Sequence, residues 1–178
     1  MIPTDDSLLA ARAGAPAAFT ALVRKHQRSV YSLALRMLTD RHKAEDLAQE
    51  VFLQLHRSLH SIESDAHLLF WLRRVTTNRA IDRLRQEPRY VAVSLEACTD
   101  LESERHEGDP LLQRRLREVI AQLPPVPRAV VLLRYQEDLD PTEIARTLGM
   151  PINSVKSHLK RSLAVLRARI QDIAPTDS

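Results

Sequence analysis

Basic and polar side chains recur through the segment 153–161. They are Asn153, Ser154, Lys156, Ser157, His158, Lys160 and Arg161. Cations bind phosphate groups regardless of nucleotide sequence, whereas amides and hydroxyls can read the edges of bases. Between residues 152 and 170 the chain has five Lys or Arg and no Asp or Glu. The segment therefore predicts a helix face that lies along DNA.

A helix-turn-helix must hold these side chains in place. Asp140 suits the cap of a first helix, Pro141 its first turn, and Glu143 the acidic position of a capping box. Gly149 is expected to end this helix in the left-handed conformation, and the second helix begins near Asn153. The inward faces of both helices carry apolar residues at helical spacing, namely Ile144, Ala145, Leu148, Val155, Leu159, Leu163 and Leu166. The alternative is an ordinary helical hairpin whose basic face is merely solvated.

A second basic strip is predicted on a helix from about Asp65 to Arg85. Its buried stripe consists of Leu68, Trp71, Leu72 and Val75. Its polar surface consists of Arg73, Arg74, Thr76, Thr77, Asn78, Arg79, Arg83 and Arg85. Asp82 is the only acid beside these arginines, so this surface is also suited to bind DNA. Trp71 is expected in the core rather than at the surface as a platform for base stacking.

A helix predicted from Asp40 to Ser58 has an acidic outer face. Its inner stripe consists of Ala44, Leu47, Ala48, Val51 and Leu55. Its outer face consists of Asp46, Gln49, Glu50, Leu53 and Arg57, with Phe52 at the edge. Acidic groups around apolar anchors are unsuited to DNA and typical of a protein–protein interface. Taken alone, the pattern fits a solvated face with one exposed leucine equally well.

Charge is unevenly distributed along the 178 residues, although the net charge is only +3. Residues 1–86 carry 13 Lys or Arg against 9 Asp or Glu, and residues 111–178 carry 11 against 7. Residues 87–110 carry 2 against 7, together with two prolines and a glycine. We therefore expect an all-α fold of two basic modules and an acidic connector without regular structure. Further helices are predicted near 4–13, 17–38, 111–123 and 126–135, and the only β pattern, 90–94, lies in the connector.

The sequence offers little for other chemistry. A single cysteine, Cys98, excludes an internal disulfide and fits a reducing cytoplasm. No apolar run approaches the roughly 18 residues that span a membrane, and no signal-peptide core is present, so we expect a soluble, cytoplasmic protein without direct membrane contact. His56 and His60 are four residues apart, but no carboxylate or cysteine is placed to complete a metal site. Without a Gly-rich phosphate loop or a nucleophile–base motif, we expect no metal, no cofactor and no enzymatic activity.

The chain resembles the bacterial extracytoplasmic-function (ECF) RNA polymerase sigma factors in three segments. These are HKAEDLAQEVFLQLHRSL (42–59), FWLRRVTTNRAIDRLR (70–85) and LPPVPRAVVLLRYQEDLDPTEIARTLGMPINSVKSHLKRSLAVLR (123–167). The resemblance implies two small helical domains: sigma domain 2 (1–88) and the helix-turn-helix sigma domain 4 (111–178), joined by a flexible acidic linker (89–110). It also implies a protein that binds core RNA polymerase and directs promoter-specific initiation. The implied partners are the β and β′ subunits, promoter DNA and an anti-sigma factor.

The resemblance also implies roles for individual residues. The polymerase-binding surface is the acidic outer face, which decides between its two interpretations: Asp46, Gln49, Glu50, Phe52 and Leu53. The minus-ten promoter element meets a loop and the second basic strip at Ser61, Glu63, Ser64, Arg74, Asn78, Arg79 and Arg83. The minus-thirty-five element meets Asn153, Ser154, Lys156, Ser157, His158, Lys160 and Arg161. The chain departs from the usual family pattern at Glu63, at the pair 76–77 and at His158, where arginine is common.

Two other classes of protein compete with this interpretation. A conventional helix-turn-helix repressor or activator explains residues 140–170, but it leaves the acidic face and the second basic strip without a task. A serine recombinase with a helix-turn-helix tail requires a nucleophilic serine among arginines on a sheet-bearing domain. Residues 1–86 are wholly helical in pattern, which disfavours that class.

Overall fold

The computed structural model describes residues 6–87 and 109–171, and every regular element in these ranges is a helix. In chain order the elements are α1 (Asp6–Arg12), α2 (Pro16–Leu38), α3 (Arg41–Ser58), the 3-10 turn η1 (Leu59–Ser61), α4 (Asp65–Gln86), α5 (Pro110–Ala121), α6 (Pro125–Tyr135), α7 (Pro141–Leu148) and α8 (Ile152–Gln171). The all-α prediction is confirmed for these residues, and each predicted helix lies within a few residues of its expected limits. The predicted irregular connector and the 90–94 β pattern fall on residues 88–108, outside the described part of the chain.

Polar side chains cap the helices that carry the candidate sites. A side-chain oxygen of Asp40 accepts a hydrogen bond from the backbone N–H of Lys43 at 3.0 Å, as the sequence predicts for the start of α3. The hydroxyl of Ser64 accepts from the backbone N–H of His67 at 3.1 Å before α4. Such caps satisfy backbone N–H groups that have no partner within the helix. The caps therefore fix the residues at which α3 and α4 begin. The starting residue in turn determines which side chains each helix presents to solvent.

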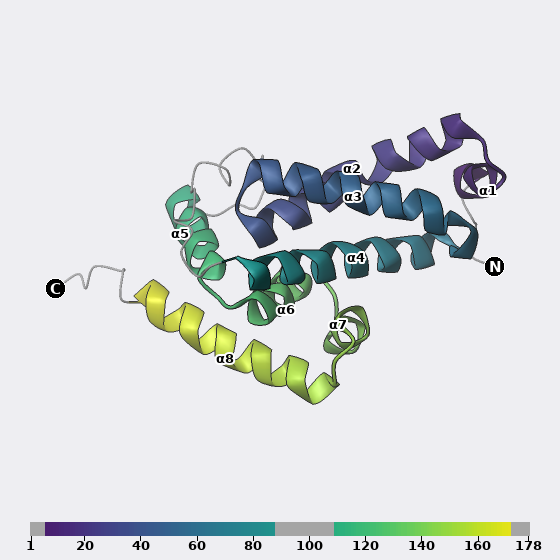
Figure 1. The fold of residues 1–178 in the computed structure, drawn as a ribbon. Coiled ribbons are helices and arrows are strands. Elements are labelled where there is room, and N and C mark those ends of the chain that lie inside the picture. The colour runs from purple at the N-terminus through teal and green to yellow at the C-terminus, as the bar shows by residue number, and fades with distance from the viewer. Residues whose placement is uncertain (1–5, 88–108, 172–178) are drawn as a thin grey trace.

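The two halves of the chain are in direct contact. In the first half, α2, α3 and α4 pack on one another and α1 crosses one end of α2 (Figure 1). In the second half, α6 lies between α4 and α8, while α7 contacts both α4 and α8 (Figure 1). The helix α4 therefore has neighbours from both halves of the molecule.

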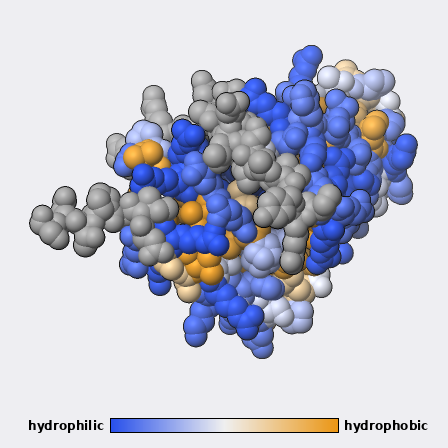
Figure 2. Space-filling view, turned by 60° about the vertical axis from the view of Figure 1, so that its left-hand side comes forward, coloured by the Kyte–Doolittle hydropathy of each residue, from blue (hydrophilic) through white to orange (hydrophobic). Residues whose placement is uncertain are grey.

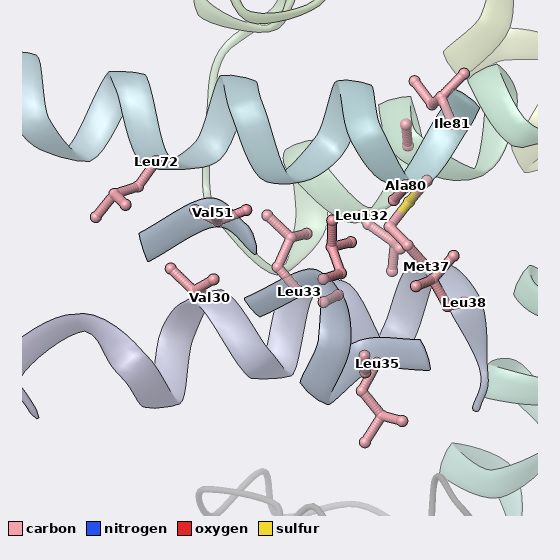
Figure 3. Close-up of a cluster of buried hydrophobic side chains, with 14 of the residues drawn as sticks. Val30, Leu33, Leu35, Met37, Leu38, Val51, Leu72, Ala80, Ile81 and Leu132 are labelled. Atoms are coloured by element: carbon pink, nitrogen blue, oxygen red, sulfur yellow. The ribbon is translucent and has the colours of Figure 1, made fainter. Parts of the chain in front are cut away.

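One hydrophobic core joins the halves. Figure 3 shows Leu132 of α6 beside Met37 of α2 and Ala80 of α4, and all three side chains are buried. A second, smaller cluster lies beneath the helix-turn-helix and consists of Val130, Leu133, Leu139, Ile144 and Val155. The helix α6 contributes to both clusters, so it connects the helix-turn-helix to the first half.

One face of the molecule is mostly polar (Figure 2). Figure 2 shows one face on which hydrophilic residues predominate, with small hydrophobic patches between them. Among the larger apolar side chains, Leu53 of α3 is 61% exposed and Leu111 of α5 is 53% exposed. Within residues 6–87 and 109–171, no helix is long and apolar enough to cross a membrane.

Candidate functional site

The helices α7 and α8 form the predicted helix-turn-helix. Asp140 accepts hydrogen bonds from the N–H groups of Thr142 and Glu143 at 2.7 and 2.9 Å, and Glu143 accepts from the N–H of Asp140 at 2.8 Å. This is the predicted capping box. Gly149 ends α7 with φ 64°, the left-handed conformation that favours glycine. Both local predictions are confirmed.

The outer face of α8 is open to solvent over most of its predicted DNA-facing residues. Five of them are exposed: Asn153, Lys156, Ser157, Lys160 and Arg161. The other two, Ser154 and His158, are half-buried. In the described parts of the chain, no ion pair involves a side chain of α8. The five exposed residues are called here the α8 strip. Their cations can therefore bind phosphates without first breaking an ion pair with a carboxylate.

The predicted polymerase-binding residues lie together on α3. Asp46, Gln49, Glu50 and Leu53 are exposed, and Phe52 is half-buried against the hydrophobic core. These five residues, called here the acidic face, combine carboxylates with an apolar anchor. Their backbone is held by the buried inner stripe of α3, where Ala44, Leu47, Val51 and Leu55 are all fully enclosed.

The acidic face is linked to the second basic strip through Glu50. One carboxylate oxygen of Glu50 lies 3.1 Å from a guanidinium nitrogen of Arg79, and the other lies 2.7 Å from Arg83. Arg79 also donates two hydrogen bonds to the side-chain oxygen of Gln54, at 3.0 and 2.7 Å. Arg83 donates to the backbone carbonyl of Lys43 at 3.0 Å. Residues expected to bind different partners, polymerase and DNA, thus bind each other here.

Arg73 and Phe70 of α4 meet residues of the second half of the chain. The α4 strip is defined as Arg73, Arg74, Asn78, Arg79, Arg83 and Arg85. Arg73 donates from Nε to Glu137 at 2.9 Å. Arg74 lies 6.0 Å from the ring centre of Phe70, and Arg146 of α7 lies over the same ring at 5.4 Å. Sequence reasoning missed Glu137 and Arg146, which are distant in sequence and carry no local signal for this contact.

The loop before α4 is stabilised by its own polar groups. The hydroxyl of Ser61 donates to the carbonyl of Ser58 at 2.7 Å, and the N–H of Glu63 donates to Nδ1 of His67 at 3.3 Å. Ser64 caps α4, as described above. The side chains of Ser61 and Glu63 are exposed, whereas that of Ser64 is half-buried. The loop is therefore ordered by residues that also belong to its predicted DNA surface.

One prediction for α4 is wrong. Thr76 and Thr77 were expected on its polar surface, but both are fully buried, and their hydroxyls have no hydrogen-bond partner within the described residues. The physical reason is that α4 is packed by α2 and α3 on one side and by α6 and α7 on another. A helix with neighbours on two sides keeps only a narrow exposed face along its middle, and Thr76 and Thr77 lie outside it. Trp71, by contrast, packs against the core as predicted.

The comparisons with known proteins cover both halves. Residues 22–90 match Sigma-70 region 2, and residues 113–166 match Sigma-70, region 4. Over 169 residues the chain is 31% identical to the ECF RNA polymerase sigma factor SigW of Bacillus subtilis (strain 168), which spans 88% of this chain and 90% of that protein.

Two solved structures share the fold. The structure of CnrH in complex with the cytosolic domain of CnrY has a TM-score of 0.70 at 21% identity and covers 94% of this chain and 97% of that chain. The sigma factor RpoE in complex with the anti-sigma factor NepR from Bartonella quintana has a TM-score of 0.67 at 18% identity. It covers 86% of this chain and 96% of that chain.

Proposed function

The chain belongs to the ECF RNA polymerase sigma factors, and on this premise we propose how its surfaces divide the work of promoter recognition. A sigma factor binds core RNA polymerase and directs initiation at particular promoters. It supplies sequence-dependent binding free energy to an enzyme that performs the chemistry. We assign one surface to polymerase and two to DNA, and we assign no enzymatic step to this chain.

The acidic face on α3 is proposed to bind the β′ subunit. Its exposed carboxylates, Asp46 and Glu50, favour a basic partner, while the exposed Leu53 provides an apolar anchor next to the half-buried Phe52. Gln49 lies between the two carboxylates and can hydrogen-bond across the interface. The acidic face would repel DNA, which supports a protein as its partner.

The minus-ten element is proposed to meet α4 and the preceding loop. Arg74 is exposed and Asn78 half-buried on the α4 strip, and Ser61 and Glu63 are exposed on the loop. Arg79 and Arg83 complete this surface once their contacts with Glu50 are exchanged. Removing a base from the stack costs a few kcal/mol, which contacts to the displaced strand must offset.

The minus-thirty-five element is proposed to meet the α8 strip in the major groove. Lys156, Lys160 and Arg161 supply phosphate contacts, and the polar groups of Asn153 and Ser157 can read base edges. A good bidentate base contact adds about 1–3 kcal/mol of discrimination. The half-buried Ser154 and His158 flank this surface and are proposed to contribute at its edge.

We propose domain limits of 1–88 and 111–178, with 89–110 as the linker. A linked pair of weak DNA contacts binds more tightly than either alone because the second contact forms at a high effective concentration. The cytoplasm is the proposed location, since core polymerase acts there. We further propose regulation by an anti-sigma factor, supported by the fold shared with RpoE, whose structure was solved with such an inhibitor.

The observation that carries the proposal is the exposed α8 strip, which forms no ion pair within residues 6–87 and 109–171. It lies on a correctly capped helix-turn-helix in a chain that matches both sigma regions in order. The test is transcription in vitro from a genomic library with purified core polymerase. We expect promoter-specific transcripts with the full chain and none without it. Charge reversal by Asp46→Lys and Glu50→Lys should abolish association with core polymerase, whereas Asp6→Lys, an exposed acid on α1, should not. Unchanged association after the double reversal would refute the assignment of the acidic face.

A further inference from the structure

The first turn of α4 carries a side chain that none of the surfaces assigned above includes. His67 is the third residue of this helix, and its backbone N–H donates to the hydroxyl of the cap residue Ser64 at 3.1 Å. Its ring nitrogen Nδ1 accepts a hydrogen bond from the backbone N–H of Glu63 at 3.3 Å. The two bonds run in opposite directions, as in a capping box, but here the acceptor is an imidazole that reaches one residue beyond the cap. His67 therefore ties Glu63 of the loop to the start of α4.

Apolar side chains anchor the same loop from the other direction. Leu59 of η1 and Ile62 are both buried in the hydrophobic core, and the N–H of Ile62 donates to the carbonyl of Leu59 at 3.2 Å. The residues on either side of Ile62, Ser61 and Glu63, are exposed. Burial therefore fixes the loop at Ile62, and the bond to His67 holds the backbone of the next residue, whose side chain faces solvent.

The bond to Glu63 requires a neutral imidazole. Nδ1 accepts a hydrogen bond only when the ring carries its one proton on Nε2, so the bond itself assigns this tautomer. In this form His67 is not a cation and gives no charged contact to a phosphate. A glutamine side chain at the same position can also accept through its amide oxygen, whereas alanine cannot. The property that matters at position 67 is therefore an acceptor of the right reach.

The chemistry of Glu63 restricts the bases that the loop can accept. An ionised carboxylate only accepts hydrogen bonds. A base removed from the stack is read along its Watson–Crick edge. Cytosine, adenine and guanine present an amino group on that edge, whereas the N–H of thymine lies between two carbonyl oxygens that repel a carboxylate. Glu63 therefore favours a base with an exocyclic amino group over thymine.

We propose that His67 is a positioning residue for minus-ten recognition: it holds Glu63 so that the carboxylate selects a base with an exocyclic amino group and rejects thymine. The inference rests on the proposed minus-ten role of the loop. A hydrogen bond weakens steeply when its distance or angle is poor, so a carboxylate on a loosely held backbone discriminates less while keeping its charge. Loss of the acceptor at position 67 therefore changes which bases are selected rather than how tightly DNA is bound overall.

The first measurement is solvent exchange of the Glu63 backbone N–H in the full chain, followed by NMR. His67→Ala removes the acceptor and should speed this exchange about fivefold, as the loss of one hydrogen bond predicts. His67→Gln keeps an acceptor and should stay close to the wild-type rate. His42→Ala is the matched control, because it removes an exposed imidazole from the first turn of α3, and η1 follows the opposite end of that helix.

The second measurement is base selection by core polymerase carrying the full chain. A promoter obtained from the genomic library is given a randomised minus-ten element, and the templates that yield transcripts are sequenced. The wild-type chain should reject thymine at least about fivefold at the position that the loop meets. His67→Ala should reduce this ratio to less than about twofold, and so should Glu63→Gln, because a glutamine amide can donate to thymine as well as accept. His67→Gln and His42→Ala should retain most of the wild-type ratio.

Three outcomes would overturn the inference. Faster exchange in His67→Ala with an unchanged selection ratio would make His67 a helix cap and nothing more. An equal loss of selection in His67→Ala and His67→Gln would show that the acceptor is not what matters. A wild-type chain that accepts thymine as well as the other bases would remove the role given to Glu63. None of these outcomes touches the proposed function, which fails only if the wild-type chain gives no promoter-specific transcript with core polymerase.

Discussion

The two basic strips of this molecule are similar in composition but differ in their surroundings. In the described parts of the chain, the cations of the α8 strip form no ion pair. In the α4 strip, Arg73 is bound by Glu137, and both Arg79 and Arg83 are bound by Glu50. One strip is therefore ready for phosphate, and the other is already occupied by carboxylates of the same chain.

The difference teaches that positive charge in a sequence does not measure capacity to bind DNA. A cation without a carboxylate partner contributes the full free energy of its contact with phosphate. A cation that is already paired must first break its ion pair, so its net contribution is the free energy of the phosphate contact minus that of the carboxylate contact. Binding by α4 thus depends on what happens to Glu50 and Glu137. DNA binding by α4 is therefore proposed to require the exchange of these carboxylate contacts, and DNA binding by α8 is proposed to require no such exchange.

Arg128, the most buried lysine or arginine among residues 6–87 and 109–171, gives the largest expected effect. Arg128→Met leaves the backbone carbonyls of Met37, Ala121 and Leu123 without their donor. Hydrogen bonds to a charged group are worth about 1.5–3 kcal/mol each, and unpaired buried acceptors add a penalty, so unfolding should become easier by at least about 3 kcal/mol. Urea denaturation followed by circular dichroism measures the change.

The control for this prediction is Arg114→Met on α5. Arg114 forms an exposed pair with Glu118, four residues along the same helix, at 3.2 Å. Its loss should cost no more than about 0.5 kcal/mol. If the two variants lose similar free energies of unfolding, the burial of an arginine does not determine how much it stabilises this fold.

Replacing unpaired cations should alter DNA binding and leave the fold intact. Lys160→Ala with Arg161→Ala removes two of the proposed phosphate contacts, each worth about 0.9 in the slope of log K against log salt. At 0.1 M salt we expect affinity for duplex DNA to fall at least about tenfold. Arg167→Ala with Arg169→Ala makes the same charge change toward the other end of α8 and should have a smaller effect. Equal losses in anisotropy titrations would mean that overall charge, and not the α8 strip, accounts for binding.

The helix-turn-helix could be predicted from sequence because its determinants are local. The cap at Asp140, the acid at Glu143 and the turn at Gly149 lie within ten consecutive residues, and each adopts its expected conformation. The apolar spacing of Ile144 and Val155 defines their buried faces directly. The inner stripe of α3 was predictable for the same reason, since periodicity along one helix specifies which side is buried.

The state of the α4 strip could not be predicted, because it depends on contacts between distant residues. Arg73 and Glu137 are 64 positions apart, and Arg128 and the carbonyl of Met37 are 91 apart. Thr76 was misplaced on the surface because a helical wheel assumes a solvent side, and α4 has neighbours from both halves instead. Periodicity carries no information about a second neighbour supplied by the other half of the chain.

The cap that supports the α8 strip gives a prediction of intermediate size. Asp140→Ala removes the acceptor for two backbone N–H groups and should lower the free energy of unfolding by about 1 kcal/mol. Asp140→Asn retains an acceptor and should cost less. Because the α8 strip itself is unchanged, duplex affinity measured well below the unfolding temperature should stay within about twofold. A tenfold loss of affinity would show that the capping box positions α8 as well as stabilising α7.

The smallest expected effect compares two carboxylates of the acidic face. Glu50→Gln weakens the hold on Arg79 and Arg83, while Asp46→Asn makes the same charge change one helical turn earlier. Both should weaken association with core polymerase. Only Glu50→Gln should raise the affinity of the free chain for single-stranded DNA, by about threefold, because a partly exposed pair contributes up to about 1 kcal/mol. Anisotropy with a random 30-nucleotide strand measures this gain. If Asp46→Asn produces the same gain, the ion pairs of Glu50 do not specifically restrain the arginines of α4. The two strips would then differ only in how much negative charge lies near them.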